Sequence, residues 1–217
     1  MRSMDRWATF DCYGTLIDWN GGIGRELERL YGPEHAASLL HEYHEVEPRV
    51  QRETPGMSYR DVMATTLSRI SHVPAGEEDA LGRSLPSWQT FPEVPASLEE
   101  VRARGWKLAI LSNTDREFID ASMERIGVPF ELAIVAGELG SYKPALRHWE
   151  EFSARTGADP AHHVHVAASL FHDVAPAREL GLRSVWINRL GEEPKPHPDV
   201  ELRSLSGLAD ALDSLVA

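Results

Sequence analysis

The chain has 217 residues, of which 42% are hydrophobic and 26% are charged, which is typical of a folded globular protein and excludes wholesale disorder. Its 22 basic and 34 acidic residues give a formal net charge of −12, which disfavours nucleic acid as a partner. No apolar run approaches the roughly 18 residues that a membrane span needs, and no secretory signal follows Met1. The single cysteine, Cys12, excludes an internal disulfide and a cysteine-based metal cage. The sequence therefore predicts a cytoplasmic protein that binds neither nucleic acid nor membrane.

Short apolar runs alternate with helical patterns along most of the chain. Five runs have the length of a buried strand: residues 7–10, 106–111, 131–135, 164–168 and 183–187. Apolar stripes at helical spacing, most of them followed closely by a glycine that favours a helix end, predict helices over residues 96–104, 116–126, 145–154, 174–180 and 206–216. This alternation predicts an α/β fold, a Rossmann-like parallel sheet with helices on both faces.

The alternation is interrupted between residues 17 and 92, where we find no convincing strand. Helical patterns lie there over residues 26–31, 36–52 and 58–70. Ser58, followed by Asp61, resembles a capping box at the start of the third helix. We therefore expect a core domain made of residues 1–16 and 93–217, with a helical cap domain, residues 17–92, inserted after the first strand.

Polar residues follow the predicted strands at the sheet edge where open parallel sheets bind their ligands. In chain order these residues are Asp11, Ser112, Asn113, Lys143, Ser169, His172 and Asp173. A carboxylate held at a strand end and partly desolvated, as we expect for Asp11, is a competent nucleophile. Lys143 would neutralise that carboxylate and the charge that develops on a substrate, and Asp173 would hold the lysine or a water. We expect these side chains to converge into one catalytic site.

Four ordered motifs carry a resemblance to a known family. FDCYGTL (residues 10–16), LSN (residues 111–113), YKP (residues 142–144) and the region of Asp173 resemble the motifs of the haloacid dehalogenase superfamily, whose helical cap follows the first motif. Tyr13 stands where the phosphatase branch has a second aspartate, so the chain looks instead like the L-2-haloacid dehalogenases. That resemblance implies a hydrolase without a metal or other cofactor, in which an aspartate displaces halide from a small 2-haloalkanoic acid and water hydrolyses the resulting ester.

The resemblance also implies roles for individual residues. Asp11 would be the nucleophile, and the other catalytic residues would be Thr15, Ser112, Lys143 and Asp173. The substrate-binding residues would be Cys12, Tyr13, Trp19, Arg49, Asn113, Ser169 and His172. Arg49 and Arg52 are the nearest counterparts of the cap arginine that binds halide in the family. The partner would be a small carboxylate substrate, and the family habit implies a homodimer.

Departures from the family pattern leave alternatives open. Ala168 and Leu170 stand where that branch often has a serine and an asparagine that place the hydrolytic water, and Trp149 aligns with a tyrosine. One alternative is a Mg²⁺-dependent phosphatase acting on a small phosphate ester, with Asp11 and Asp173 as the metal carboxylates. Its missing general acid at Tyr13 weakens that alternative. Another alternative is a non-catalytic protein that keeps the fold and binds a ligand, and a third is attack by Asp11 on a different activated carbon.

Two groups of histidines have the spacing of metal ligands. His162, His163 and His165 lie at a predicted strand without acidic partners nearby, and we interpret them as structural. His41 and His44 lie among glutamates on a predicted helix, and we interpret this face as solvated. The sequence therefore predicts no metal site. We interpret Cys12 as a packing residue rather than a nucleophile.

Overall fold

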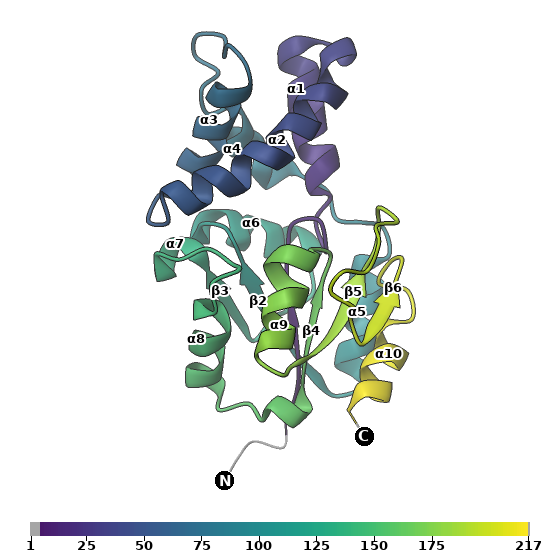
Figure 1. Ribbon diagram of the computed structural model, residues 1–217. Coiled ribbons are helices and arrows are strands. Elements are labelled where there is room, and N and C mark those ends of the chain that lie inside the picture. Colours follow the sequence, from purple (N-terminus) through teal and green to yellow (C-terminus); the bar gives the residue numbers. More distant parts are fainter. Residues whose placement is uncertain (1–4, 217) are drawn as a thin grey trace.

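The computed structural model describes residues 5–216 and has a six-stranded parallel sheet at its centre (Figure 1). The strands lie in the order β3-β2-β1-β4-β5-β6. Their bounds are Arg6–Phe10 (β1), Trp106–Ser112 (β2), Leu132–Val135 (β3), His163–Ala167 (β4), Arg183–Ile187 (β5) and Val200–Leu202 (β6). All five neighbouring pairs are parallel, which confirms the predicted fold class. Residues 1–4, where the sequence was searched for a secretory signal, lie outside the described residues.

Alternate residues of the strands face two hydrophobic clusters on opposite faces of the sheet. In β1, Ala8 and Phe10 belong to the larger cluster, whereas Trp7 belongs to the smaller one, as the two-residue period of a strand requires. Helices α5 (Val94–Ala103), α6 (Arg116–Ile126) and α10 (Leu208–Leu215) contribute to the larger cluster, and α8 (Arg147–Thr156) contributes to the smaller. The core of the molecule therefore consists of a sheet between two helical layers.

The helices of the core follow the predicted pattern, with one informative difference. Helix α6 has the predicted bounds and ends at Gly127, whose φ of 70° is a left-handed conformation that glycine adopts without strain. Between β4 and the five-residue helix α9 (Ala175–Glu179), residues Leu170–Val174 form a π-helical turn, in which the N–H of Ala175 bonds to the carbonyl of Leu170. Such turns contain one more residue than an α-helical turn and are frequent at functional sites.

A layer of helices lies beyond the carboxyl ends of the strands (Figure 1). They are α1 (Trp19–Tyr31), α2 (Pro33–Glu53), α3 (Tyr59–Ile70) and α4 (Ala80–Ser84), and the short 3₁₀ turn Leu85–Ser87 follows them. Ser58 caps α3 as predicted, because its Oγ accepts a hydrogen bond from the N–H of Asp61 at 3.1 Å. These helices fall within residues 17–92, the range expected for a cap. No helix that the structure describes is both long enough and apolar enough to cross a membrane.

Polar contacts attach this helical layer to the sheet. Ile17, in the segment that leaves the sheet, forms an antiparallel bridge with Thr90, in the segment that returns to it. Asp115, which directly precedes α6, accepts hydrogen bonds from the backbone N–H groups of Tyr59 and Arg60 at 3.0 Å each. A carboxylate is favourable at this position because the first turn of α3 has unpaired N–H groups. The helical layer is thereby held over the edge of the sheet where the predicted site lies.

Candidate active site

A cavity of about 570 Å³ lies between the carboxyl edge of the sheet and the helical layer. Its sheet-side wall includes Asp11, Tyr13, Ser112, Asn113, Lys143, Ser169, His172 and Asp173, all of which the sequence predicted as site residues. Its helix-side wall includes Trp19, Asn20, His44, Glu47, Gln51 and Tyr59. The side chains from motifs far apart in the sequence are therefore brought together as expected.

Asp11 follows β1 directly and is held by hydrogen bonds to both of its carboxylate oxygens. Lys143 Nζ donates to Oδ1 at 2.9 Å, and Thr15 Oγ1 donates to Oδ2 at 2.8 Å. Thr15 Oγ1 in turn accepts from the backbone N–H of Ala168 at 2.9 Å, which fixes the direction of its own proton. Burial raises the pKa of Asp11 above its usual value, and the ammonium of Lys143 opposes that rise. The carboxylate is therefore oriented, desolvated and paired with a cation.

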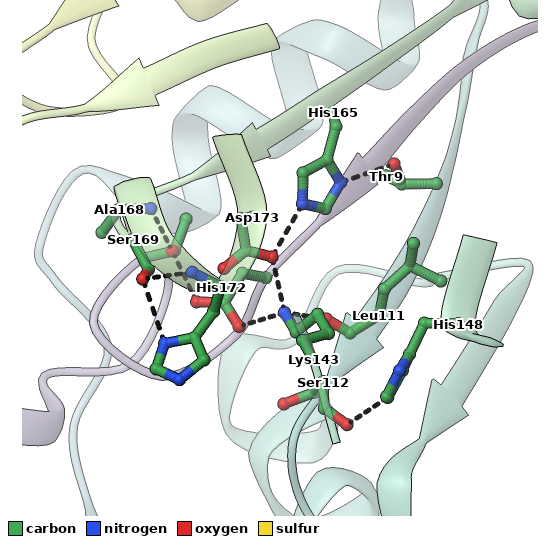
Figure 2. Close-up of polar contacts among 12 residues, drawn as sticks. Thr9, Leu111, Ser112, Lys143, His148, His165, Ala168, Ser169, His172 and Asp173 are labelled. Atoms are coloured by element: carbon green, nitrogen blue, oxygen red, sulfur yellow. Dashed lines mark hydrogen bonds and ion pairs between the residues drawn. The ribbon is translucent and has the colours of Figure 1, made fainter. Parts of the chain in front are cut away.

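Lys143 is the centre of a buried charged cluster (Figure 2). Only 1% of its side chain is exposed, and Nζ donates to Asp11, to Asp173 Oδ1 at 2.6 Å and to the carbonyl of Leu111 at 2.8 Å. Burial alone would lower the pKa of Lys143, but the two carboxylates raise it above its usual value. Burial opposes the ionisation of Asp173 as well, yet Lys143 and His165 hold its pKa below the usual range. The lysine therefore stays charged, and each of its three ammonium protons donates a hydrogen bond within the protein.

A hydrogen-bonded chain supports Asp173 from within the core. His165 Nε2 lies 2.9 Å from Asp173 Oδ1, and His165 Nδ1 lies 2.9 Å from Thr9 Oγ1 (Figure 2). Thr9 Oγ1 is also 2.7 Å from His163 Nε2. His163 and His165 were interpreted as structural, and His165 in fact orients a site residue. Their spacing of two along β4 places both on one face of the strand, next to Thr9. No group of three or more histidine, cysteine or acidic side chains suited to a metal occurs among residues 5–216.

Ser169 and His172 form a second polar group beside the charged cluster. The backbone N–H of His172 donates to Ser169 Oγ at 3.0 Å, and that oxygen lies 3.1 Å from His172 Nδ1 (Figure 2). Burial lowers the pKa of His172 to about 4, so the imidazole is neutral at neutral pH. The π-helical turn positions both side chains, because its extra residue lies between the Ser169 cap and Asp173. The cavity therefore contains a neutral imidazole close to the buried charges.

Ser112 and Asn113 differ in their contacts. Ser112 Oγ is buried and forms no hydrogen bond with the residues that the structure describes, so its hydroxyl is available to a ligand. The side chain of Asn113 bonds both backbone groups of Lys143: Oδ1 accepts from the N–H at 2.6 Å, and Nδ2 donates to the carbonyl at 3.0 Å. Asn113 therefore fixes the position of the loop that carries Lys143, although it also lines the cavity.

Two predicted substrate-binding residues do not line the cavity. Cys12 is fully buried in the larger hydrophobic cluster, and burial raises the pKa of its thiol well above the usual value. Arg49 extends into solvent with 59% of its side chain exposed and lies 3.8 Å from Glu45, with which it forms an ion pair. Arg52 lines a smaller, adjoining cavity of about 260 Å³. The structure does not bring Arg49 to the site, because it lies on the outer face of α2.

Sequence reasoning missed most of the helix-side wall, and one interpretation was wrong. His44 was expected on a solvated face, but its ring stacks on Trp19 with centroids 4.9 Å apart, its Nε2 lies 3.0 Å from Asn20 Oδ1, and it lines the cavity. Glu47 and Gln51 line it as well. The available signal was the stripe of Tyr43, Glu47, Val50 and Gln51, whose spacing places them on one buried face of α2. Arg189, after β5, was also missed; it donates to the carbonyl of Thr15 at 2.8 Å.

Comparisons with known proteins agree with this geometry. A family model described as haloacid dehalogenase-like hydrolase matches residues 6–181. An (S)-2-haloacid dehalogenase from Pseudomonas sp. (strain YL) is 30% identical over 217 residues, covering 94% of this chain and 93% of that protein. A phosphoserine phosphatase from Thermus thermophilus is 31% identical over 140 residues, covering 62% of this chain and 56% of that protein. The structure of an L-2-haloacid dehalogenase from Xanthobacter autotrophicus with chloropropionic acid covalently bound shares the fold, with a TM-score of 0.84, 18% identity, and coverage of 97% of this chain and 99% of that one.

Proposed function

The chain belongs to the haloacid dehalogenase-like hydrolases, and we propose that it is a metal-independent (S)-2-haloacid dehalogenase in which Asp11 is the nucleophile. The observation that carries this proposal is the state of Asp11, whose two oxygens are fixed by Lys143 and Thr15 at the wall of the cavity. A carboxylate held in this way is pre-organised for attack on carbon. The relative from Pseudomonas supports a small 2-haloalkanoic acid as the substrate.

In the first half of the reaction, an oxygen of Asp11 attacks C2 of the substrate. The new C–O bond forms as the carbon–halogen bond breaks, and halide leaves with the electron pair. In-line attack inverts C2, so an (S)-2-haloacid yields an (R)-2-hydroxy acid after hydrolysis of the ester. The hydroxyl of Ser112, which lines the cavity and has no hydrogen-bond partner among the described residues, supplies a hydrogen bond to the substrate carboxylate.

In the second half, water hydrolyses the ester of Asp11. His172 is placed to assist, because it is neutral and lines the same cavity. When Nδ1–H donates to Ser169 Oγ, the lone pair of Nε2 is left to accept a proton from water. Asp11 leaves the ester as a carboxylate, and Lys143 stabilises the negative charge that returns to it. The Ser169–His172 pair thus substitutes for the residues that are missing at Ala168 and Leu170.

A Mg²⁺-dependent phosphatase is not favoured. Its general acid would occupy position 13, where Tyr13 has its hydroxyl 3.0 Å from Ser122 Oγ and a pKa that burial raises well above the usual value. Asp173, the other acid proposed for a metal, already binds Lys143 and His165 through Oδ1.

Three further expectations stay predictions: the homodimer, the cytoplasmic location, and the division into a core and a cap at residues 17 and 92.

The test is halide release from (S)- and (R)-2-chloropropionate in EDTA, with a general phosphatase substrate plus Mg²⁺ assayed in parallel. We expect chloride from the (S) isomer in EDTA, together with the (R)-hydroxy acid. Phosphate release that depends on Mg²⁺, without any halide release, would replace the proposal by the phosphatase alternative. Binding of haloacid without turnover of any substrate would favour a non-catalytic protein.

A further inference from the structure

The direction of the proposed attack determines where the halide must go. Asp11 lies on the sheet-side wall, and in-line displacement sends the leaving group away from the attacking oxygen, toward the helix-side wall. Among the described residues that line the cavity, the permanently charged cations are Lys143 and Arg189. Both belong to the sheet-side wall, where Arg189 forms an ion pair with Glu93 at 2.8 Å and Lys143 forms ion pairs with Asp11 and Asp173. The halide therefore leaves toward a wall that offers no fixed positive charge.

Glu47 is the buried acidic residue of that wall, and only 6% of it is exposed. Trp19 Nε1 donates to Tyr59 Oη at 3.1 Å, and Tyr59 Oη donates to Glu47 Oε1 at 2.9 Å. This chain of hydrogen bonds, from Trp19 at the start of α1 through Tyr59 at the start of α3, therefore ends at Oε1 of Glu47. The acidic proton of the carboxyl group is then carried by Oε2. A carboxylic acid in this form is a hydrogen-bond donor.

We propose that Glu47, in its protonated form, is the group that donates a hydrogen bond to the departing halide, in place of a cap arginine. The inference rests on the proposed dehalogenase function and adds a specificity-determining residue to it. No proton is transferred, because hydrogen halides are stronger acids than a carboxylic acid: the halide leaves with the bonding electrons, and the proton stays on Oε2. An ionised Glu47 would instead repel both the halide and the anionic substrate.

The electrostatic environment of Glu47 favours this protonated form. Burial raises its pKa to about 7, although the hydroxyls of Tyr59 and Tyr43 oppose the rise. The titratable or charged groups around it are Tyr43 and His44 on α2, Tyr59 on α3, and, elsewhere on the cavity wall, Asp11, Tyr13, Asp18, Lys143, His172, Asp173, Arg189 and Glu192. His44 is largely neutral, because burial lowers its pKa. A bound substrate anion disfavours ionisation of Glu47 further, so the active form of the wall is neutral.

The pH dependence of three variants tests this inference. For the unaltered enzyme we expect kcat/KM for (S)-2-chloropropionate to fall about tenfold per pH unit above pH about 7, as Glu47 ionises. Glu47→Gln keeps a donor that cannot ionise and should remove this alkaline limb. Glu47→Ala should lose about tenfold or more at every pH, because it has no donor. Glu45→Gln, two residues away on the solvent-exposed face of α2 and paired with Arg49, is the matched control and should follow the unaltered profile.

A binding measurement separates this inference from the proposed function. Chloride binding, followed by the ³⁵Cl NMR line width, should be stronger at pH 5.5 than at pH 8.5 in the unaltered protein and independent of pH in Glu47→Gln. This result without any turnover would support the halide site and overturn the dehalogenase proposal. If the unaltered enzyme turns over, either of two results would overturn the inference. One is that Glu47→Gln keeps the fall in kcat/KM at alkaline pH, and the other is that Glu47→Ala matches the unaltered enzyme in both rate and chloride binding.

Discussion

Replacement of Lys143 by methionine tests the electrostatics of the site most severely. Methionine retains much of the length of the side chain but removes the ammonium and its three hydrogen bonds, to Asp11, Asp173 and the Leu111 carbonyl. The two carboxylates are then left buried without a cation. At neutral pH we expect at least one of them to take up a proton on folding, which would leave Asp11 without a competent, oriented charge for attack.

The cost of that proton can be worked out from the ordinary pKa of 3.8 for an aspartate. At about 1.4 kcal/mol per pH unit, protonating one such group costs between about 4 and 5 kcal/mol at pH 7 and about 2 kcal/mol at pH 5. The first value agrees with the roughly 3–5 kcal/mol lost when one partner of a buried ion pair is removed. In the variant the folded carboxyl pKa lies above its unfolded value, so stability should increase as the pH falls.

Urea denaturation of the unaltered protein and Lys143→Met at pH 7 and pH 5 measures this difference, with chloride release assayed in parallel. We expect the destabilisation to be about 3 kcal/mol smaller at pH 5 than at pH 7, and turnover to be lost at both values. Lys107→Met is the matched control: its ion pair with Asp5 at 2.7 Å is solvent-exposed, so we expect a change of about 1 kcal/mol or less. A destabilisation by Lys143→Met that is below about 1 kcal/mol, or that grows as the pH falls, would refute the reasoning.

Three other predictions follow from the site. His172→Gln should slow hydrolysis of the ester more than its formation, so that one equivalent of halide appears in a burst and mass spectrometry detects the alkylated protein; equal slowing of both steps would remove His172 from the hydrolytic step. Arg49→Ala should leave kcat/KM for (S)-2-chloropropionate unchanged, because the side chain is solvent-exposed, and a loss above about tenfold would place it at the halide after all. Chloride release should fall at acidic pH, because burial raises the pKa of Asp11 and its protonated form does not attack; a rate that stays constant down to pH 4 would contradict this assignment.

The sheet and the sheet-side wall of the site were predictable because they depend on local patterns. Strands buried on both faces appear as short apolar runs, and a parallel sheet collects the residues after those runs at one edge. Asp11, Ser112, Lys143 and Asp173 were therefore expected together, and they lie together. Strand β6 was missed because its three residues, Val200–Leu202, lie at the edge of the sheet, and none of them is fully buried.

The helix-side wall was not predictable in the same way, because it depends on the rotation of α2 about its own axis. Glu47 and Arg49 lie about 200° apart around the axis of α2, so the rotation of the helix decides which of the two faces the cavity, and the sequence carries charged residues on both faces. The packing of Tyr43 and Val50 against α1 and α3 settles that rotation, and it turns Arg49 outward. The support of Asp173 by His165 was hidden for a related reason, since it depends on which strands are neighbours in the sheet.

The central claim, that Asp11 forms an ester with the substrate, is tested most directly by a single turnover in H₂¹⁸O with enzyme in excess over (S)-2-chloropropionate. Because water attacks the carbonyl carbon of the ester, one ¹⁸O atom should enter the carboxylate of Asp11, and the peptide that contains it should gain about 2 Da. The lactate released in that turnover should carry no label. Label in the lactate with an unlabelled Asp11 peptide would mean that water attacks the substrate directly, and it would contradict the account.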